Sequence, residues 1–202
     1  LNTAAAYPIG TILNQPGQEK AKTYTLRREG NQVIAERVEG TGLRIVKTYS
    51  LPEPEKLKEY NVELTVSFRN TGAHAIEKAG YYLFIGAIEP GPHELPHYYT
   101  GLDWYKDDDA TFIATNWFDA KRIPLVGITR SPGQAVYSET PGGVIWAGVR
   151  NQYFTSLIST VETPANGVWA ERFATKVEEE ETFGISGALA LGGFHLEPGA
   201  ST

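Results

Sequence analysis

The fold is decided by the stretch Val62-Glu63-Leu64-Thr65-Val66-Ser67-Phe68-Arg69, in which apolar and polar side chains alternate one by one. Successive side chains of a β-strand point to opposite faces of its sheet, so this period of two predicts a strand with one buried face. Asn70-Thr71-Gly72 follows at once, and Asn and Gly tolerate the backbone angles of tight turns. The segment therefore predicts antiparallel β structure.

The same signal continues on both sides of this strand. Residues 23–28 and 32–38 flank Gly30-Asn31, a pair typical of a two-residue hairpin turn with Gly first. Residues 53–60 have a helix-like composition, and residues 89–110 are expected to form a long ordered loop because prolines, aromatics and an acidic run gather there. Further strands are predicted at residues 43–50, 81–88, 111–115, 125–129, 144–149, 153–160, 168–176 and 182–191. We predict an all-β protein, an extended two-sheet antiparallel sandwich with at most short helices.

Composition narrows the functional classes. The 202 residues carry a formal net charge of -6 and include no cysteine. An acidic chain does not gather phosphates, so nucleic acid is excluded as a partner, and disulfides and thiolate metal sites are excluded as well. No segment reaches the ~20 apolar residues of a membrane span, so we expect this chain itself to be soluble. Because it begins at Leu1 and contains no methionine, we expect it to be part of a longer protein.

The expected organisation is a lead-in and one domain. Residues 1–20 contain apolar side chains interrupted by prolines and glycines, which predicts an extended segment. No repeat or linker divides residues 21–202, and a β-sandwich of roughly 200 residues commonly remains a single domain. We therefore expect one β-sandwich domain over residues 21–202.

One segment matches the zinc-protease pattern H-E-x-x-H: His93-Glu94-Leu95-Pro96-His97. That pattern works because a helix places both histidines on one face, one turn apart. Pro96 and the neighbouring prolines and glycine prevent a helix of useful length here. We therefore predict no metal site and no catalytic residue, and interpret the segment as a proline-rich loop.

The same region also suggests a second class of function. His93 and His97 lie close in sequence to Trp104 and Trp117, and all four are candidates to line a cleft. Histidines with carboxylates can perform acid–base chemistry, and large aromatic rings can stack on sugars. A carbohydrate-binding or aldose-epimerase-like sandwich is therefore the alternative hypothesis, against the simpler interpretation that these aromatics fill the core.

A family resemblance enters with the stretch of residues 142–154, Gly-Gly-Val-Ile-Trp-Ala-Gly-Val-Arg-Asn-Gln-Tyr-Phe. It resembles the "G-G-W-x-G-x-x-x-x-Y-F" region of the large periplasmic domain of YidC-type membrane protein insertases. Val46-Lys47-Thr48-Tyr49, the segment of residues 60–66 and the turn at residues 70–72 are similar to further blocks of that family, in the same order.

This resemblance implies a fold and a role. The fold is a β-super-sandwich similar to galactose mutarotase, located between the first two membrane helices of a bacterial inner-membrane insertase. The domain would lie on the periplasmic face, tethered to the membrane, without enzymatic activity or cofactor. Its partners would be Sec translocon subunits and inserting membrane proteins. We expect the motif residues Gly143, Trp146, Tyr153 and Phe154 to be structural, because such rings on consecutive strands bury much apolar area.

Overall fold

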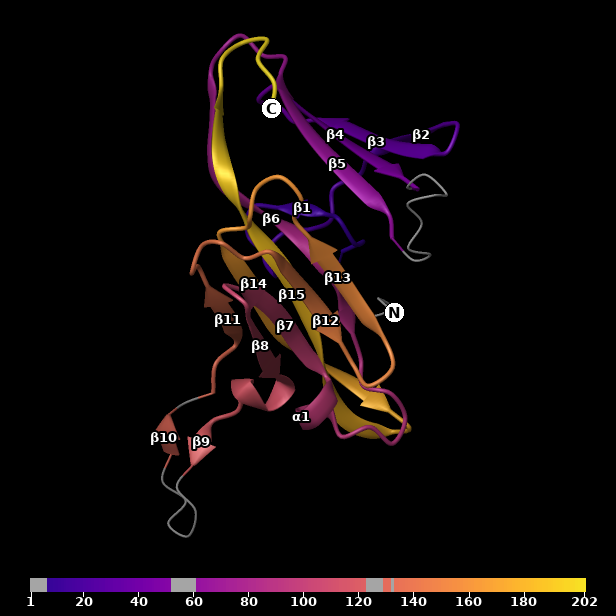
Figure 1. Cartoon of the computed structure of the whole chain (residues 1–202), viewed down its shortest axis with the longest axis vertical. Coiled ribbons are helices and arrows are strands. Elements are labelled where there is room, and N and C mark those ends of the chain that lie inside the picture. Colours follow the sequence, from indigo (N-terminus) through magenta and orange to yellow (C-terminus); the bar gives the residue numbers. More distant parts are fainter. Residues whose placement is uncertain (1–6, 52–60, 123–128, 132) are drawn as a thin grey trace. The chain divides into compact units, whose positions relative to one another are not determined.

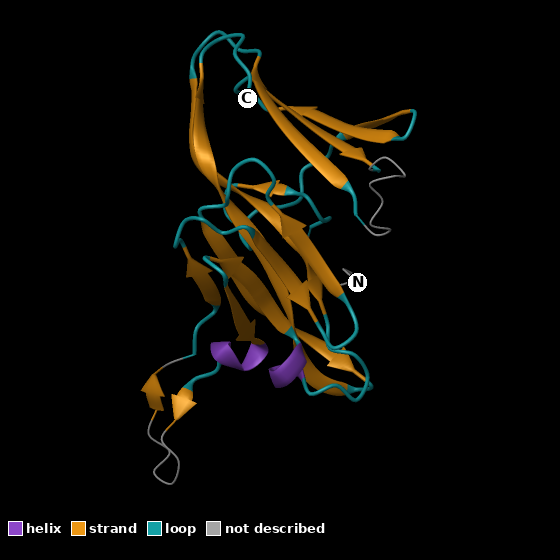
Figure 2. Ribbon diagram, in the orientation of Figure 1, coloured by secondary structure: helices purple, strands orange, loops and turns teal. Residues whose placement is uncertain are grey.

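The computed structural model describes residues 7–51, 61–122, 129–131 and 133–202. Strands make up most of these residues and the helices are single turns, which confirms the predicted all-β sandwich (Figures 1 and 2). In chain order the elements are β1 (Ile12–Leu13), β2 (Thr25–Glu29), β3 (Gln32–Val38), β4 (Leu43–Ser50), β5 (Glu63–Asn70), β6 (Ile76–Ile88), α1 (Pro96–Tyr99), β7 (Gly101–Lys106), β8 (Asp109–Ala114), the 3₁₀ helix η2 (Thr115–Phe118), β9 (Lys121–Arg122), β10 (Thr129–Ser131), β11 (Val136–Glu139), β12 (Trp146–Arg150), β13 (Thr155–Ser159), β14 (Gly167–Val177) and β15 (Glu180–Leu196).

These elements form two compact units. The first unit comprises Leu1–Ala21 and Gly80–Gly192, and the second comprises Lys22–Ala79 and Gly193–Thr202. The long strands β6 and β15 contribute residues to both units. Within the second unit, β2 to β5 build a sheet of their own. The single domain expected over residues 21–202 stays a prediction.

The first unit is a sandwich of two antiparallel sheets. A five-stranded sheet has the order β1-β6-β15-β14-β11, and a four-stranded sheet has the order β13-β12-β7-β8. A Cβ atom added to Gly187 of β15 would lie 2.8 Å from Leu102 of β7 and 2.8 Å from Val149 of β12, so glycine allows the two sheets to approach here. The buried apolar residues of this core are Ile85, Ile88, Leu102, Trp104, Ile113, Phe118, Tyr137, Val144, Ala147, Val149, Ala165, Val168, Ala170, Ile185 and Leu189.

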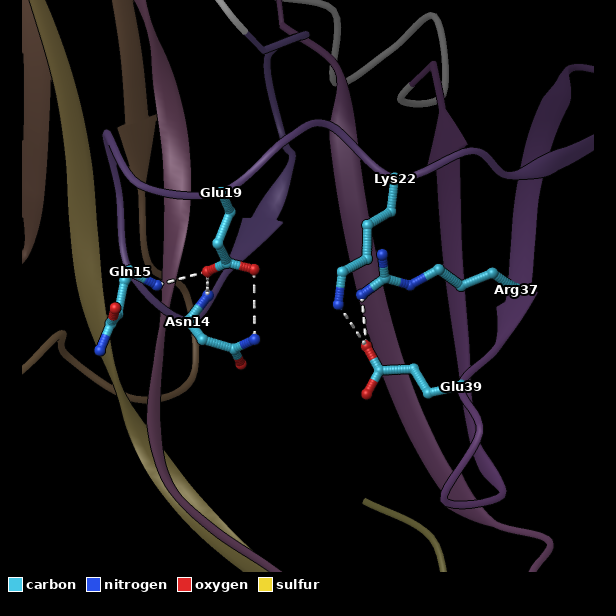
Figure 3. Close-up of polar contacts among 6 residues, drawn as sticks. All are labelled: Asn14, Gln15, Glu19, Lys22, Arg37 and Glu39. Atoms are coloured by element: carbon cyan, nitrogen blue, oxygen red, sulfur yellow. Dashed lines mark hydrogen bonds and ion pairs between the residues drawn. The ribbon is translucent and has the colours of Figure 1, made fainter.

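The expected lead-in is part of the first unit. β1 pairs with β6, and the ring of Tyr7 packs edge-on against Phe84, with 5.2 Å between the ring centroids. The Tyr7 hydroxyl donates to the carbonyl oxygen of Glu19 at 2.5 Å, and the Glu19 carboxylate accepts from the backbone N–H groups of Asn14 and Gln15 (Figure 3). A second apolar cluster results, formed by Tyr7, Leu13, Phe84, Ala87, Trp169 and Ala188. The apolar residues that we assigned to an extended segment therefore cover the first unit's larger sheet.

The segment of residues 89–110 is also more ordered than a loop. It contains α1 and β7, and β7 pairs with both β12 and β8 in the centre of the smaller sheet. Leu102 and Trp104 face the core, while Asp103 and Tyr105, which alternate with them, are more exposed. Because the segment is rich in aromatic and acidic residues, the alternation of buried and exposed side chains in β7 was not recognised from the sequence. The helix expected at residues 53–60 lies outside the described residues, as does most of the strand expected at 125–129.

Among the described residues, three hairpins have two-residue turns. The predicted turn at Gly30-Asn31 is confirmed, since Glu29 pairs with Gln32 and Gly30 has a φ of 59°. The turn at Asp107-Asp108 has φ angles of 49° and 63°, and the turn at Glu178-Glu179 has φ angles of 50° and 69°. In the last two turns both central residues have positive φ, which is the type I′ pattern that suits twisted hairpins. Asn and Gly adopt this conformation at a lower energetic cost than Asp or Glu.

The second unit is built on the sheet β2-β3-β4-β5. Leu43, Ile45 and Phe68 are buried on one face, and the Phe68 ring lies 4.6 Å from that of Phe194. The end of the chain extends this sheet, because Thr202 exchanges two backbone hydrogen bonds with Phe68, at 2.8 and 2.9 Å. Sequence positions far apart are thereby joined within one unit.

Candidate functional site

The motif tryptophan lies on the outward face of the smaller sheet. Ala147 and Val149 of β12 are fully buried, so Trp146 on the same strand points to the opposite face. It pairs with Tyr105 of β7, and the two rings are stacked, with an angle of 4° and 5.6 Å between centroids. Trp146 is therefore only partly buried and belongs to a surface aromatic pair.

A charged pair lies on the same face, beside these rings. Arg150 Nε donates to Asp103 Oδ2 at 2.5 Å, and the guanidinium lies 4.2 Å from the centroid of the Phe112 ring. Burial raises the pKa of the Asp103 carboxyl, and the positive charge of Arg150 opposes this rise. The outward face thus combines stacked rings with an oriented carboxylate and guanidinium.

The Tyr-Phe pair of the motif lies in the loop between β12 and β13. Asn151 Oδ1 accepts from the backbone N–H groups of Tyr153 and Phe154, at 2.9 and 2.8 Å, and its Nδ2 donates to the Glu89 carbonyl oxygen at 2.8 Å. The Tyr153 and Phe154 side chains are 63% and 57% exposed. The expectation of buried structural rings is thus wrong for this pair, because the Asn151 side chain closes a turn that directs both residues outward.

Glu94 connects this loop to the segment of residues 91–100. The residue is 8% exposed, and its carboxylate accepts from the Thr100 hydroxyl at 2.6 Å, the Gly91 N–H at 2.9 Å and the Gln152 N–H at 3.2 Å. Several hydrogen bonds of this kind hold a backbone in one conformation. The glutamate of the H-E-x-x-H match therefore fixes two loops against each other.

The structure separates the candidate cleft residues. His93 lies on a turn, with its side chain 85% exposed and 3.5 Å from Glu178. His97 belongs to α1, which begins at Pro96, so the two histidines do not share a helix face; the His97 side chain is outside the described set. Within the described residues no group of three or more His, Asp or Glu side chains could hold a metal ion.

Trp104 and Trp117 do come together, but in the core. Trp104 is 9% exposed and its Nε1 donates to the Tyr137 hydroxyl at 3.2 Å. The Trp117 ring meets Tyr137 edge-on, with 5.0 Å between centroids. Both tryptophans thus pack around Tyr137, which corrects the expectation that they line a cleft with the histidines.

The two connected loops carry an exposed apolar surface, which we call the aromatic loops. It consists of Leu95, Tyr98, Tyr99, Tyr153 and Phe154, of which Leu95 is 53% and Tyr98 62% exposed. Large rings on a fixed backbone lose little conformational entropy when they bind, so this surface suits contact with another protein. The sequence signal that could have located it is the Asn-x-aromatic-aromatic order of residues 151–154.

Sequence reasoning missed a second feature, in the second unit. A hollow of about 530 Å³ is lined by Lys22, Thr23, Arg37, Val38, Glu39, Gly40 and Thr41. Arg37 Nη2 donates to Glu39 Oε1 at 2.6 Å, and Lys22 Nζ lies 3.5 Å from the same oxygen (Figure 3). Two cations therefore share one carboxylate beside the hollow.

The fold and these sites describe an all-β sandwich with an exposed aromatic surface. No protein-family model and no curated protein sequence matches the chain. Among the described residues, none of the helices has the length and apolar character needed to cross a membrane.

Proposed function

We propose that the chain is a non-enzymatic periplasmic domain of a YidC-type bacterial inner-membrane insertase, which supports membrane protein insertion and contacts the Sec translocon. The observation that carries this proposal is the place of its most distinctive sequence block. That block, residues 142–154, contains the Trp146 surface pair and ends in the exposed Tyr153 and Phe154. Exposed rings held by Asn151 and Glu94 serve contact with a partner better than they serve the core.

The other blocks of the resemblance add support. Val46-Lys47-Thr48-Tyr49 lies in β4, residues 63–66 of the next block lie in β5, and these strands are neighbours in the second unit's sheet. Lys47 pairs with Val66, so two blocks separated in sequence meet in register. The two blocks that resemble the family therefore lie on paired strands of one sheet.

The first test is genetic and needs no assay. The reading frame that encodes this chain should include a hydrophobic segment before Leu1 and several after Thr202. A frame without such segments would contradict the proposal.

The second test asks whether the aromatic loops contact the translocon. A photo-crosslinking amino acid is placed at Tyr153 or Phe154 of the full-length protein in inner-membrane vesicles. Val161, which is 96% exposed in the same unit, provides the control position. Crosslinks to translocon subunits from the loop positions, and none from Val161, are expected; equal labelling at all three positions would count against the proposal.

A carbohydrate-binding role is the second candidate, and one observation favours it. The stacked Tyr105 and Trp146 rings lie on the same outward face as Asp103 and Arg150. Sugars bind where rings cover their C–H faces and charged groups accept or donate to hydroxyls. Titration with hexoses, followed by tryptophan fluorescence, tests this role; a response in the wild type that Trp146→Ala abolishes and Trp117→Phe retains would support it.

A further inference from the structure

The hairpin between β14 and β15 carries four consecutive glutamates at its end, residues 178–181, which we call the acidic tip. All four are exposed. His93, in the loop before α1, has its Nδ1 atom 3.5 Å from Oε2 of Glu178. Figure 1 shows this hairpin and the loop before α1 at the same end of the first unit. The acidic tip therefore lies beside the aromatic loops.

Further contacts fix this hairpin and the aromatic loops to each other. The Thr175 hydroxyl of β14 donates to Glu89 Oε1 at 2.6 Å, and the carbonyl oxygen of Glu89 accepts from Asn151. A Cβ atom added to Gly91 would lie 3.1 Å from Cε2 of Tyr153, so this ring lies against the loop before α1. The rings and the carboxylates thus form one surface whose arrangement is set before a partner binds.

This surface is rich in carboxylates and poor in cations. Residues 89–101 and 151–155, which carry the aromatic loops, contain no lysine or arginine. Residues 174–183, around the acidic tip, contain only Lys176. Exposed rings are therefore combined with an excess of negative charge, which complements a partner that brings positive charge and apolar side chains.

The chain itself shows the contact that such a partner would make. Arg172 Nη1 lies 2.5 Å from Asp119 Oδ1, and the Arg172 guanidinium lies 4.1 Å from the centroid of the Phe183 ring. Arg150 likewise contacts one carboxylate and one ring. A cation over an aromatic face is attracted by the ring, and a nearby carboxylate adds to this attraction. The aromatic loops and the acidic tip supply rings and carboxylates, and a basic partner supplies the cations.

We propose that the aromatic loops and the acidic tip together bind a basic, partly apolar segment of a partner protein. Its apolar side chains contact Leu95 and the exposed rings, and its lysine or arginine side chains pair with the carboxylates of residues 178–181. This inference rests on the aromatic loops being a contact surface, as proposed above, and adds the chemistry of the segment that they contact. An anionic membrane surface is disfavoured, because four exposed carboxylates repel negative headgroups.

Fluorescence anisotropy of a short labelled peptide of alternating lysine and leucine, titrated with the chain, tests the proposal. A matched peptide carries glutamate in place of lysine. We expect the lysine peptide to bind about tenfold more tightly than the glutamate peptide, and its affinity to fall as the salt concentration rises. Equal affinities, or no binding of either peptide, would overturn the proposal.

Matched variants locate the charges that matter. The double variant Glu180→Gln and Glu181→Gln removes two exposed charges of the acidic tip and should weaken binding of the lysine peptide several-fold. The double variant Asp107→Asn and Asp109→Asn removes two exposed charges from the β7–β8 hairpin of the same unit and should leave binding unchanged. Equal losses from both double variants would indicate nonspecific attraction and overturn the proposal.

A second pair of variants tests the rings. Phe154→Ala should weaken binding of the lysine peptide several-fold, whereas Val161→Ala, at a position that is 96% exposed in the same unit, should not. Sedimentation with vesicles of phosphatidylglycerol and phosphatidylethanolamine tests the membrane alternative. Vesicle binding that Phe154→Ala abolishes, together with equal affinities for the two peptides, would assign the rings to a membrane and overturn the proposal.

Crosslinking in the full-length protein separates this inference from the translocon contact. With the photo-crosslinking amino acid at Tyr153, the double variant Glu180→Gln and Glu181→Gln should reduce crosslinks to translocon subunits. Crosslinks that persist unchanged would retain the translocon contact and overturn only the basic segment. Binding of the lysine peptide without any translocon crosslink would support the basic segment and reject the translocon as its source.

Discussion

The side-chain amide of Asn70 donates a 2.9 Å hydrogen bond to the carbonyl oxygen of Leu196, 126 residues away in sequence. The same nitrogen donates to the His74 carbonyl at 2.8 Å, and Asn70 Oδ1 accepts from the Gly72 N–H at 2.9 Å. Asn70 is fully buried. One side chain therefore closes the turn after β5 and joins it to the end of β15 within the second unit.

Replacing Asn70 with alanine should destabilise the second unit by about 2–4 kcal/mol, because two carbonyl groups and one N–H would lose their buried partner. Urea unfolding monitored by circular dichroism measures the change. Asn61→Ala, at an exposed position before the same strand, serves as the control and should change the free energy of unfolding by less than about 0.5 kcal/mol. Similar values for both variants would show that the Asn70 network contributes little.

Substitutions in the turn at Glu178-Glu179 should increase the stability of the protein. Both residues have positive φ, which costs a glutamate more than Asn or Gly, and both belong to a run of four carboxylates. Replacement by Asn-Gly should raise the free energy of unfolding by about 0.5–1 kcal/mol, measured by thermal unfolding. A Gln-Gln replacement removes the charges but keeps the backbone cost. If Gln-Gln stabilises equally, charge repulsion and not backbone strain is responsible.

His195 should titrate above its ordinary pKa. Hydrogen bonds to Glu197 and then Glu77, at 3.0 and 2.6 Å, favour the protonated ring and raise the pKa of His195. The folded state therefore holds the proton more tightly than the unfolded state. This contribution to stability is complete below pH 6.5, the ordinary value, and is lost as the pH rises through the raised pKa. NMR titration of the ring should show the shift, and Glu197→Gln should reduce it; an unchanged pKa in that variant would contradict the assignment.

The contribution of Lys47 to stability should depend on pH in the opposite direction to that of His195. Its pKa falls from 10.5 to about 8, so the unfolded state binds more protons between these values and stability rises with pH in this window. At pH 7 the lysine is charged in both states and its burial is unfavourable. Lys47→Met should therefore stabilise the protein by about 1–3 kcal/mol at pH 7. The difference between variant and wild type should narrow from pH 8 to 9.5; a constant difference would show that packing and not charge is responsible.

Alternation alone located several strands and missed others for physical reasons. The bounds predicted for β3 and β4, residues 32–38 and 43–50, agree with the structure, and in β4 the buried residues alternate with less buried ones from Leu43 to Lys47. β7 was missed because its outward residues include Tyr105, which obscures the alternation. Arg37 and Lys47 could not be associated from sequence, since they meet only through the register of two paired strands.

Asn151 allows the fold and the function of the aromatic loops to be tested separately. Its side chain closes the turn and bonds to Glu89, so Asn151→Ala should destabilise the protein by about 1–3 kcal/mol. The double variant Tyr153→Ala and Phe154→Ala removes rings that are mostly exposed, and should cost less than about 1 kcal/mol instead of the ~3–5 kcal/mol typical of buried aromatics. Thermal unfolding of the chain gives one readout, and crosslinking in the full-length protein from a photo-crosslinking amino acid at Leu95, which is 53% exposed in the same aromatic loops, gives the other. If the double variant retains its melting temperature but loses translocon crosslinks, the two rings act in binding. A large loss of stability would show instead that the rings contribute to the packing of the fold.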